Sequence, residues 1–276
     1  MTTLVQALQT LAPLEYAEAW DNVGLLVEPP HTDTTPWCER PCRRVFLTID
    51  LDEAVLNEAL QWGAETIVSY HPPIFRGFKR LTMGVSHQRV ILRSIQAGLA
   101  IYSPHTALDA TAHGMTDWLL SGLGPLSAQG PIVPRTETDG TTSSTVGMGR
   151  YGSLAEPQAL NTLVVALKTH LGLDHLRVAA AAVHVHGEAI TEVAVCPGAG
   201  ASVFEDLSGC ELLVTGEMRH HDILAHVASG RSVILSDHTN SERGYLPIFA
   251  QKLQHLLGDT VDICISQLDR DPLVVT

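Results

Sequence analysis

The sequence predicts an α/β protein with two α/β domains built on mainly parallel or mixed sheets. Short apolar runs typical of buried strands alternate with longer amphipathic stretches typical of helices, which is the pattern of βαβ units. The chain of 276 residues can bury a full core, and its apolar fraction of 45% is typical of a well-packed globular protein. In such sheets ligands bind outside the carboxyl ends of the strands, so we expect a functional cleft there.

The first half of the chain shows the alternation clearly. A helix is expected from Thr3 to about Leu11, because apolar residues recur on one helical stripe. The elements expected next, in chain order, are strand 44–49, helix 52–62, strand 65–69, helix 86–97, strand 99–103 and a helix near 113–121. The Pro- and Thr-rich stretch 28–42 is expected to be an exposed loop.

The middle of the chain has a different character. Residues 122–144 are rich in Gly, Pro, Ser and Thr, which indicates a boundary or a long loop. A strand-like run TVGMGRYGSL, a helix at 156–171 and short strands near 176 and 184 then suggest a small α+β unit. Strand 190–196 restarts the alternation, which continues to a closing strand DTVDICIS. We expect a main metal-binding core from 1–124 with about 190–276, and a smaller insertion or second-domain portion at about 125–189.

The composition excludes several classes of function. Lys and Arg number 17 and Asp and Glu 30, so the formal net charge is −13. Such a surface repels phosphate backbones, which argues against direct binding of nucleic acid or of an anionic membrane, although a small phosphorylated substrate is still allowed. No Lys or Arg precedes Arg40, so we expect no secretory signal or transit peptide and a cytoplasmic location.

A His–Glu pair provides the strongest indication of chemistry. His238 and Glu242 follow the apolar run SVILS and lie four residues apart, so a helix would place both side chains on one face. Tyr70 and His71 follow the strand at 65–69. His105 and Asp109 follow the strand at 99–103. Imidazole and carboxylate donors at three strand ends predict a site for zinc, iron, manganese or cobalt.

Each donor has a plainer alternative. His71 alone would be an ordinary loop histidine, although two prolines fix it at the strand tip. Asp109 would serve as a helix N-cap, and His105 is equally suited to binding a metal and to orienting another ligand. Glu242 would pair with a neighbouring arginine on the surface. The recurrence of such donors after three strands favours the metal site.

Two further groups are candidates for a role in the site. His221, in TGEMRHHD, is a candidate acid, base or substrate contact, while ordinary helix packing explains part of that segment. Gly198 and Gly200, in CPGAGAS, would expose backbone N–H groups to an anion, although glycine-rich turns are common where no ligand binds. His184 and His186 alternate and are expected on one face of a strand.

With SYHPPIF, YSPHTALDA, TGEM-x-HHD and HTNSERG in this order, the chain resembles the Ngg-interacting-factor-three-like family, also known as the type 2 form of GTP cyclohydrolase I. AEAWDNVGLLVEP, MTDWLLSGLG and CPGAGAS match too, so the resemblance covers nearly the whole chain. YHPPIF resembles the eukaryotic branch. The resemblance implies a two-domain α/β protein that forms a toroidal homohexamer with a dinuclear metal site.

The resemblance also implies which residues hold the metals. His71, Asp109 and Glu242 would hold one ion, and His238 with Glu242 would hold the second. The bacterial pattern has two adjacent histidines where this chain has Tyr70 and His71. A neutral phenol is a poor ligand, so the second ion would bind more weakly or recruit His105 or water.

These observations support two hypotheses of function. The favoured one is a hydrolase-like enzyme with two divalent ions that acts on a nucleotide or phosphoester, with His221 or His105 carrying protons. The alternative is a metal-binding scaffold that binds a transcriptional adaptor without turnover, which would add a nuclear location to the cytoplasmic one. Metal storage, which the 14 histidines would suit, is a third option.

Overall fold

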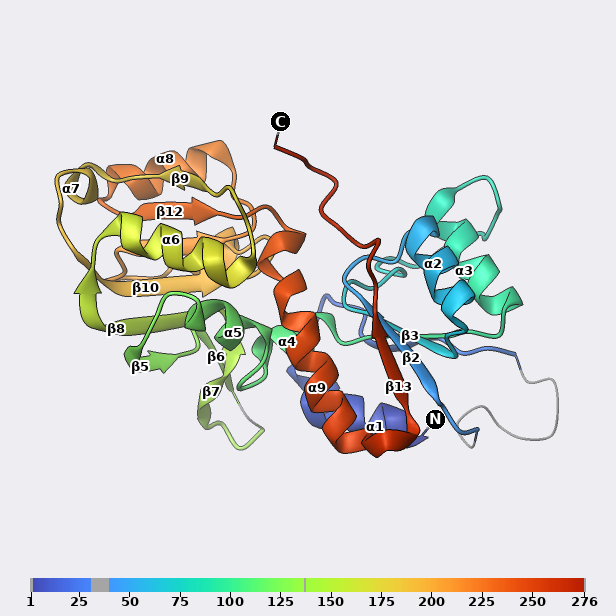
Figure 1. Ribbon diagram of the computed structural model, residues 1–276. Helices are drawn as coiled ribbons and strands as arrows, with labels where there is room; N and C mark the ends of the chain where they lie inside the picture. Colours follow the sequence, from blue (N-terminus) through green and yellow to red (C-terminus); the bar gives the residue numbers. More distant parts are fainter. Residues whose placement is uncertain (1, 31–39, 137, 276) are drawn as a thin grey trace. The chain divides into compact units, whose positions relative to one another are not determined.

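The computed structural model describes residues 2–30, 40–136 and 138–275, and its backbone groups into two compact units (Figure 1). The first unit comprises Met1–Leu108 and Leu246–Arg270, and the second comprises Asp109–Tyr245 and Asp271–Thr276. Most of the predicted loop at 28–42 lies outside the described residues. The predicted domain limits stay a prediction, because compactness does not show which segments fold independently.

The first unit is built on a five-stranded mixed sheet with the order β1-β4-β3-β2-β13. Its strands are β1 (Gly24–Val27), β2 (Arg44–Thr48), β3 (Thr66–Ser69), β4 (Ala100–Ser103) and β13 (Asp262–Ile265). β13, β2, β3 and β4 run parallel, and β1 pairs with β4 in the antiparallel direction. β3 and β4 are buried along their whole length, which agrees with their continuous apolar sequences.

Helices cover this sheet. They are α1 (Thr2–Leu11), α2 (Glu53–Trp62), α3 (Ser86–Gln96) and α9 (Leu246–Leu257). α2 and α3 bury apolar side chains against Phe46 and Ile67 of the sheet. α1 and α9 pack on each other, and α9 also contacts β13 and β2 (Figure 1). The predicted helices at 3–11, 52–62 and 86–97 are therefore confirmed to within a residue or two at their ends.

The ends of α2 show why the chain folds as it does locally. The side chain of Asp52 accepts a hydrogen bond from the N–H of Val55 at 2.8 Å, so it caps the first turn. Gly63 ends the helix with a φ of 80°, in the left-handed region that glycine adopts without a steric penalty. The helix is thereby fixed between β2 and β3.

The second unit is built on a six-stranded mixed sheet with the order β5-β8-β10-β11-β12-β9. Its strands are β5 (Leu126–Gly130), β8 (Arg150–Gln158), β9 (Arg177–Ala179), β10 (Ile190–Cys196), β11 (Leu212–Thr215) and β12 (Ser232–Leu235). β10, β11 and β12 are parallel, and the remaining pairs are antiparallel. A separate two-stranded ribbon consists of β6 (Val133–Thr136) and β7 (Thr142–Met148).

The helices of the second unit are α5 (Met115–Ser121), α6 (Leu160–Leu171), α7 (Ala182–Val185) and α8 (His220–Ala228). α4 (His105–Ala110) begins in the first unit and ends in the second. Apolar residues of β10, β11 and β12 form a core with Phe204 and Cys210. Both units thus have the predicted α/β architecture with mixed sheets.

The predictions for the middle of the chain are wrong in three places. Residues 122–144 are not a long loop, since they contain β5, β6 and the start of β7, and residues 156–158, expected to begin a helix, end β8. The residues near 184 form the short helix α7 and not a strand, so His184 and His186 do not alternate on a strand face. His184 is buried, and its Nδ1 lies 2.7 Å from the Ser232 hydroxyl. The N–H groups of His184 and Val185 both donate to the Ala181 carbonyl at 3.1 Å, and Gly187 follows with a φ of 98°, so these residues form a helical turn that ends at a glycine.

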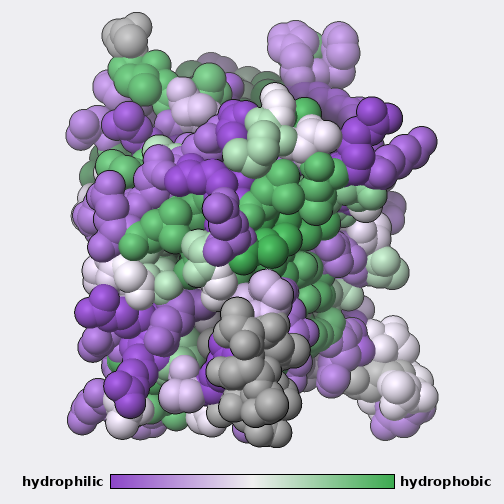
Figure 2. Space-filling model, turned by 90° about the vertical axis from the view of Figure 1, so that its right-hand side faces the viewer, coloured by the Kyte–Doolittle hydropathy of each residue, from purple (hydrophilic) through white to green (hydrophobic). Residues whose placement is uncertain are grey.

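The surface mixes hydrophilic and hydrophobic side chains. Figure 2 shows a hydrophobic patch near the middle of one face, with hydrophilic side chains around it. Large exposed apolar side chains of the first unit include Trp20 and Phe75. Within the described ranges, no helix is both long enough and apolar enough to cross a bilayer.

Candidate metal centre

In the first unit, three polar residues follow three parallel strands at the same distance. β2 ends at Thr48 and β3 at Ser69, which are paired in register, and β4 ends at Ser103. Asp50, His71 and His105 each lie two residues beyond those ends. The sheet therefore brings one carboxylate and two imidazoles to its carboxyl edge.

Each of these two imidazoles has its Nδ1 against a carboxylate. His71 Nδ1 lies 2.9 Å from Asp50 Oδ1, and His105 Nδ1 lies 2.8 Å from Asp21 Oδ1. An ionised carboxylate only accepts hydrogen bonds, so Nδ1 donates in both pairs. Nε2 is then the nitrogen suited to a metal ion, as in carboxylate–histidine–metal arrangements.

Asp21, which orients His105, is itself fixed by several hydrogen bonds. Its side chain is fully buried, and it accepts hydrogen bonds from the N–H of Asn22 and from both the N–H and the hydroxyl of Thr106. Burial alone would raise the pKa of Asp21, but the bonds from His105 and Thr106 outweigh it and hold that pKa below its usual value. His105 also has a strained backbone, with a φ of 29°.

The second unit repeats this construction. β10, β11 and β12 end in register, because Cys196 pairs with Thr215 and Thr215 pairs with Leu235. Gly198 and Glu217 lie two residues beyond their strand ends, and His238 lies three beyond. His238 Nδ1 is 3.0 Å from Glu217 Oε1, and its Nε2 is 3.6 Å from Glu242 Oε1.

The predicted helical turn between His238 and Glu242 is not an α-helix. The residues between them form a 3₁₀ turn, η4 (Thr239–Ser241), preceded by Asp237 with a φ of 68°. The Ser241 hydroxyl donates to the His238 carbonyl at 2.6 Å, and its oxygen accepts the Gly198 N–H at 2.8 Å. This tighter turn still places the imidazole beside the carboxylate, which is almost fully buried at 1% exposure.

Gly198 makes room for the two donors. Its φ is +63°, and a Cβ at this position would lie 2.9 Å from both Glu242 Oε1 and His238 Nε2. Gly200 donates its N–H to the Thr215 hydroxyl at 3.0 Å. The two glycine N–H groups thus have acceptors within the unit, and the structure gives Gly198 the role of admitting side chains close to the backbone. Their predicted contact with an anion remains untested.

Gly198→Ala is expected to disturb both donors without unfolding the unit. The added methyl group would displace Glu242 and His238, so the affinity for a divalent metal should fall at least about tenfold. Gly172→Ala is the matched control, because Gly172 has a φ of +68° and open space around its Cβ position. Both variants bear about 1 kcal/mol of left-handed backbone strain. Equal metal affinity in the two variants, measured by calorimetry, would contradict the assignment.

Asp109 lies inside α4, so it is not a helix N-cap. It is 5% exposed. Burial raises the pKa of the Cys196 thiol, and the charges of Asp109 and Glu242 raise it further. The negative charges of Asp109 and Glu242 therefore both disfavour the thiolate form of Cys196. The side chain stays a neutral thiol.

Comparisons with known proteins identify the family of the chain. A family model described as Duf34/NIF3 (NGG1p interacting factor 3) matches residues 1–272. The chain belongs to the Duf34/NIF3 family. It is 38% identical to the protein NIF3 homolog of Schizosaccharomyces pombe, over 98% of this chain and 96% of that protein. It is 34% identical to the NGG1-interacting factor 3 of Saccharomyces cerevisiae, over 99% of this chain and 96% of that protein.

The fold of this Duf34/NIF3 chain is shared with solved structures. A Bacillus cereus protein related to NIF3 superposes with a TM-score of 0.84 at 19% identity, over 99% of this chain and 98% of that chain. At that level of identity the likeness concerns the fold alone. Imidazole and carboxylate groups follow the strands of both units. A metal ion could be held by His71, His238 and Glu242.

Tyr70 occupies the place next to His71 in this Duf34/NIF3 chain. It is 3% exposed, and its ring lies 5.0 Å from the His71 ring and 5.4 Å from the His105 ring, measured between centroids. The two imidazoles are themselves 5.4 Å apart. The first unit thus gathers the three predicted residues Tyr70, His71 and His105 into one cluster.

His221 is placed differently. It lies in the first turn of α8 and is exposed, and its ring contacts the ring of His220 at 5.4 Å. Its role in proton transfer stays a prediction.

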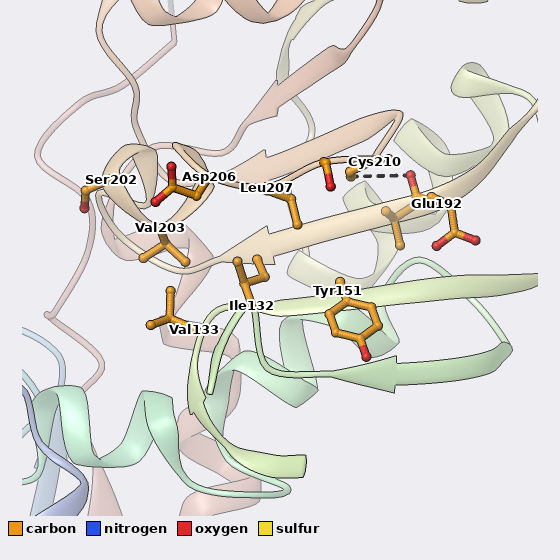
Figure 3. Close-up of a pocket in the computed structure, with 12 residues that line it drawn as sticks. Ile132, Val133, Tyr151, Glu192, Ser202, Val203, Asp206, Leu207 and Cys210 are labelled. Atoms are coloured by element: carbon orange, nitrogen blue, oxygen red, sulfur yellow. Dashed lines mark hydrogen bonds between the residues drawn. The ribbon is translucent and has the colours of Figure 1, made fainter. Parts of the chain in front are cut away.

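A separate pocket of about 550 Å³ lies within the second unit. Figure 3 shows Ile132, Val133 and Val203 facing one another across it, with Cys210 and Glu192 at one end. Burial raises the pKa of Cys210 to about 12, so its thiol is not a reactive group. None of the described residues that line this pocket is a histidine, so it is distinct from the candidate metal centre.

The sequence reasoning did not identify the carboxylates that orient the histidines. Asp21 is separated from His105 by 84 positions, and Asp50 from His71 by 21. Glu217 lies 21 positions from His238. The signal available in the sequence was the spacing from each strand end, since Asp50, His71, His105 and Glu217 all come two residues after one.

Proposed function

We propose that this Duf34/NIF3 protein is a metal-dependent, hydrolase-like enzyme that acts on a nucleotide or another phosphoester. The observation that supports it best is that three histidines, His71, His105 and His238, each have Nδ1 fixed by a carboxylate. Histidines that bind metals are oriented in this way, whereas surface histidines gain little from it. Two ions, zinc, iron, manganese or cobalt, fit this set of nitrogen and oxygen donors.

The two ions would share one donor in the proposal. His71, Asp109 and Glu242 would hold one ion, and His238 with Glu242 would hold the other. A buried carboxylate shared by two cations would offset their mutual repulsion, and Glu242 is the most buried of these donors. The space that Gly198 leaves beside Glu242 and His238 supports a function that needs both groups close to the backbone.

The ions would lower the pKa of a water molecule and polarise a phosphoryl oxygen, which is the chemistry of two-metal hydrolases. The protein contributes orientation and proton transfer. Asp21 fixes the ring of His105, so that its Nε2 can bind a metal or exchange a proton near neutral pH. His221 is the second candidate for proton transfer.

The test is the metal content of protein purified without chelator, with turnover of nucleotides and phosphoesters measured in parallel. We expect about two ions per chain in the wild type and a loss of metal in His71→Ala. His255→Ala, on the last turn of α9, is the control and should keep the wild-type content. A wild-type protein that binds no divalent metal under any loading condition would overturn the proposal.

Tyr70→His is expected to strengthen the weaker of the two sites. It would supply an imidazole where the phenol is a poor ligand, so the second ion should dissociate at a higher chelator concentration than in the wild type. Tyr70→Phe is the matched control, since it removes only the hydroxyl and should leave the metal content of the wild type unchanged. A phenylalanine variant that loses metal would instead make Tyr70 a ligand.

The second candidate function is a metal-binding scaffold without turnover. The Saccharomyces cerevisiae relative is named as an NGG1-interacting factor, which favours a protein partner for this chain as well. In this case metal removal would alter assembly or partner binding while no nucleotide is hydrolysed. The homohexamer, and a location in the cytoplasm and the nucleus, remain predictions under either function.

A further inference from the structure

The segment that follows His71 is anchored to the core of the first unit at two points. Ile74 and Phe78 pack against a cluster formed by Val27, Ile91 and Ile101. The Phe78 ring also stacks on the His87 ring, with centroids 5.5 Å apart. Because these two side chains point inward, the residues between and after them are held at the surface in a defined position.

Two aromatic side chains are left at the surface beside His105. Trp20 is 61% exposed and Phe75 is 45% exposed, and their ring centroids are 6.0 Å apart. The His105 ring lies 6.2 Å from the Trp20 ring and 6.3 Å from the Phe75 ring. The amide of Asn22 donates a hydrogen bond to the Ile74 carbonyl, which ties the two segments together.

The same segment carries a group of cations. Arg76, Lys79 and Arg80 are all exposed, so three of the 17 Lys and Arg of the chain occur within residues 76–80. In the parts of the chain that the structure describes, no ion pair or side-chain hydrogen bond engages them. In a protein with a formal charge of −13, such a group attracts an anion.

We propose that Trp20, Phe75 and these three cations form a binding site for a mononucleotide carrying several phosphates. The aromatic side chains would stack on the base, since every base has a π-face, and the cations would meet the phosphate groups. These residues would form the substrate-recognition part of the site that contains His105, so the inference rests on the proposed function. Trp20 and Phe75 contact each other and His105, yet about half of each side chain is still exposed to solvent and open to a ligand.

A nucleic acid chain fits the surface less well than a single nucleotide. A polymer requires cations along a track, because each bound phosphate contributes to affinity. Here the cations are confined to five positions, and the rest of the protein is acidic. A small ligand that meets one cationic group and one aromatic pair therefore matches the observations better.

The experiment is calorimetric titration of the full chain, with and without a divalent metal, using a purine nucleoside triphosphate, a purine nucleoside and an oligonucleotide. We expect Trp20→Ala or Phe75→Ala to weaken binding of the triphosphate about tenfold, the scale of lost base stacking. Arg76→Gln/Lys79→Gln/Arg80→Gln should weaken the triphosphate strongly and the nucleoside little. Trp20→Phe, which keeps a ring, should retain most of the affinity.

Matched controls come from other parts of the chain. Tyr151→Ala removes an aromatic side chain of similar exposure, 41%, from the second unit. Arg43→Gln/Lys168→Gln/Arg270→Gln changes the net charge as much as the triple variant. If these controls weaken the triphosphate as much as the site variants do, or if the wild type binds no triphosphate, the inference is overturned. Tighter binding of the oligonucleotide than of the triphosphate overturns it in favour of single-stranded nucleic acid.

The outcome is separable from that of the proposed function. His238→Ala should lose metal while binding of the triphosphate by the metal-free protein persists. A protein that binds the triphosphate through Trp20 but holds no metal would disprove the hydrolase and leave this site standing. A protein that holds metal but binds no nucleotide would disprove the nucleotide site and leave the proposed metal centre standing.

Discussion

Glu242→Gln is expected to abolish metal binding while leaving the fold intact. Glutamine has the size of glutamate, so the packing around this buried side chain is retained, but the negative charge shared by the two proposed ions is lost. The affinity for a divalent metal should fall by at least about 100-fold, the upper end of the loss seen when only an outer carboxylate is removed. Elemental analysis of the purified variant measures this loss.

The stability of the same variant provides an independent readout. A buried carboxylate is costly without a cation, so the metal-free variant should be at least as stable as the metal-free wild type. Added metal should raise the melting temperature of the wild type and not that of the variant, because only binding to the folded state stabilises it.

The control for this prediction is Glu188→Gln, an exposed glutamate of the second unit. It makes the same chemical change without removing a proposed ligand, so its metal content and its response to metal should equal those of the wild type. If Glu242→Gln retained the wild-type metal content, Glu242 would not be a ligand and the dinuclear proposal would fall.

The sequence was sufficient to predict the strands and helices that carry the donors. The apolar runs at 65–69, 99–103 and 190–196 are strands, because buried parallel strands have continuous apolar sequences. Their alternation with helices indicated the parallel arrangement, and this in turn indicated that side chains after the strand ends would gather. Local patterns determine these features, so one sequence is enough to find them.

The sequence was not sufficient where the geometry depends on distant residues. The turn from His238 to Glu242 is 3₁₀ and not α-helical, because Ser241 bonds both to the His238 carbonyl and to the Gly198 N–H, 43 positions away. The pairing of Asp21 with His105 likewise depends on tertiary structure. The need for glycine at position 198 follows only once Glu242 and His238 are placed beside it.

Arg150→Gln is expected to be the most destabilising substitution of a single side chain in the second unit. Arg150 is 1% exposed, and its Nε donates to Asp117 Oδ1 at 2.9 Å. It also donates to five backbone carbonyls, those of Gly147, Gly149, Thr145, Ala110 and Thr111. Loss of the guanidinium would leave the partly buried Asp117 without its cation and the carbonyls without these donors.

The expected cost is about 3–5 kcal/mol of unfolding free energy, the usual result of removing one partner of a buried ion pair. Arg177→Gln is the matched control, because Arg177 is 62% exposed and pairs with Asp237 at the surface. An exposed pair should cost no more than about 1 kcal/mol. Chemical denaturation of both variants, followed by circular dichroism, measures the difference.

Arg150 also links stability to the proposed site. Two of the carbonyls that it holds, those of Ala110 and Thr111, directly follow Asp109 in the chain. The substitution should therefore lower metal affinity as well as stability. Combining Arg150→Gln with Asp117→Asn should cost less than the sum of the two single substitutions, because the second removes the charge that the first leaves unpaired. Additive losses would show that the stability resides in the carbonyl contacts and not in the ion pair.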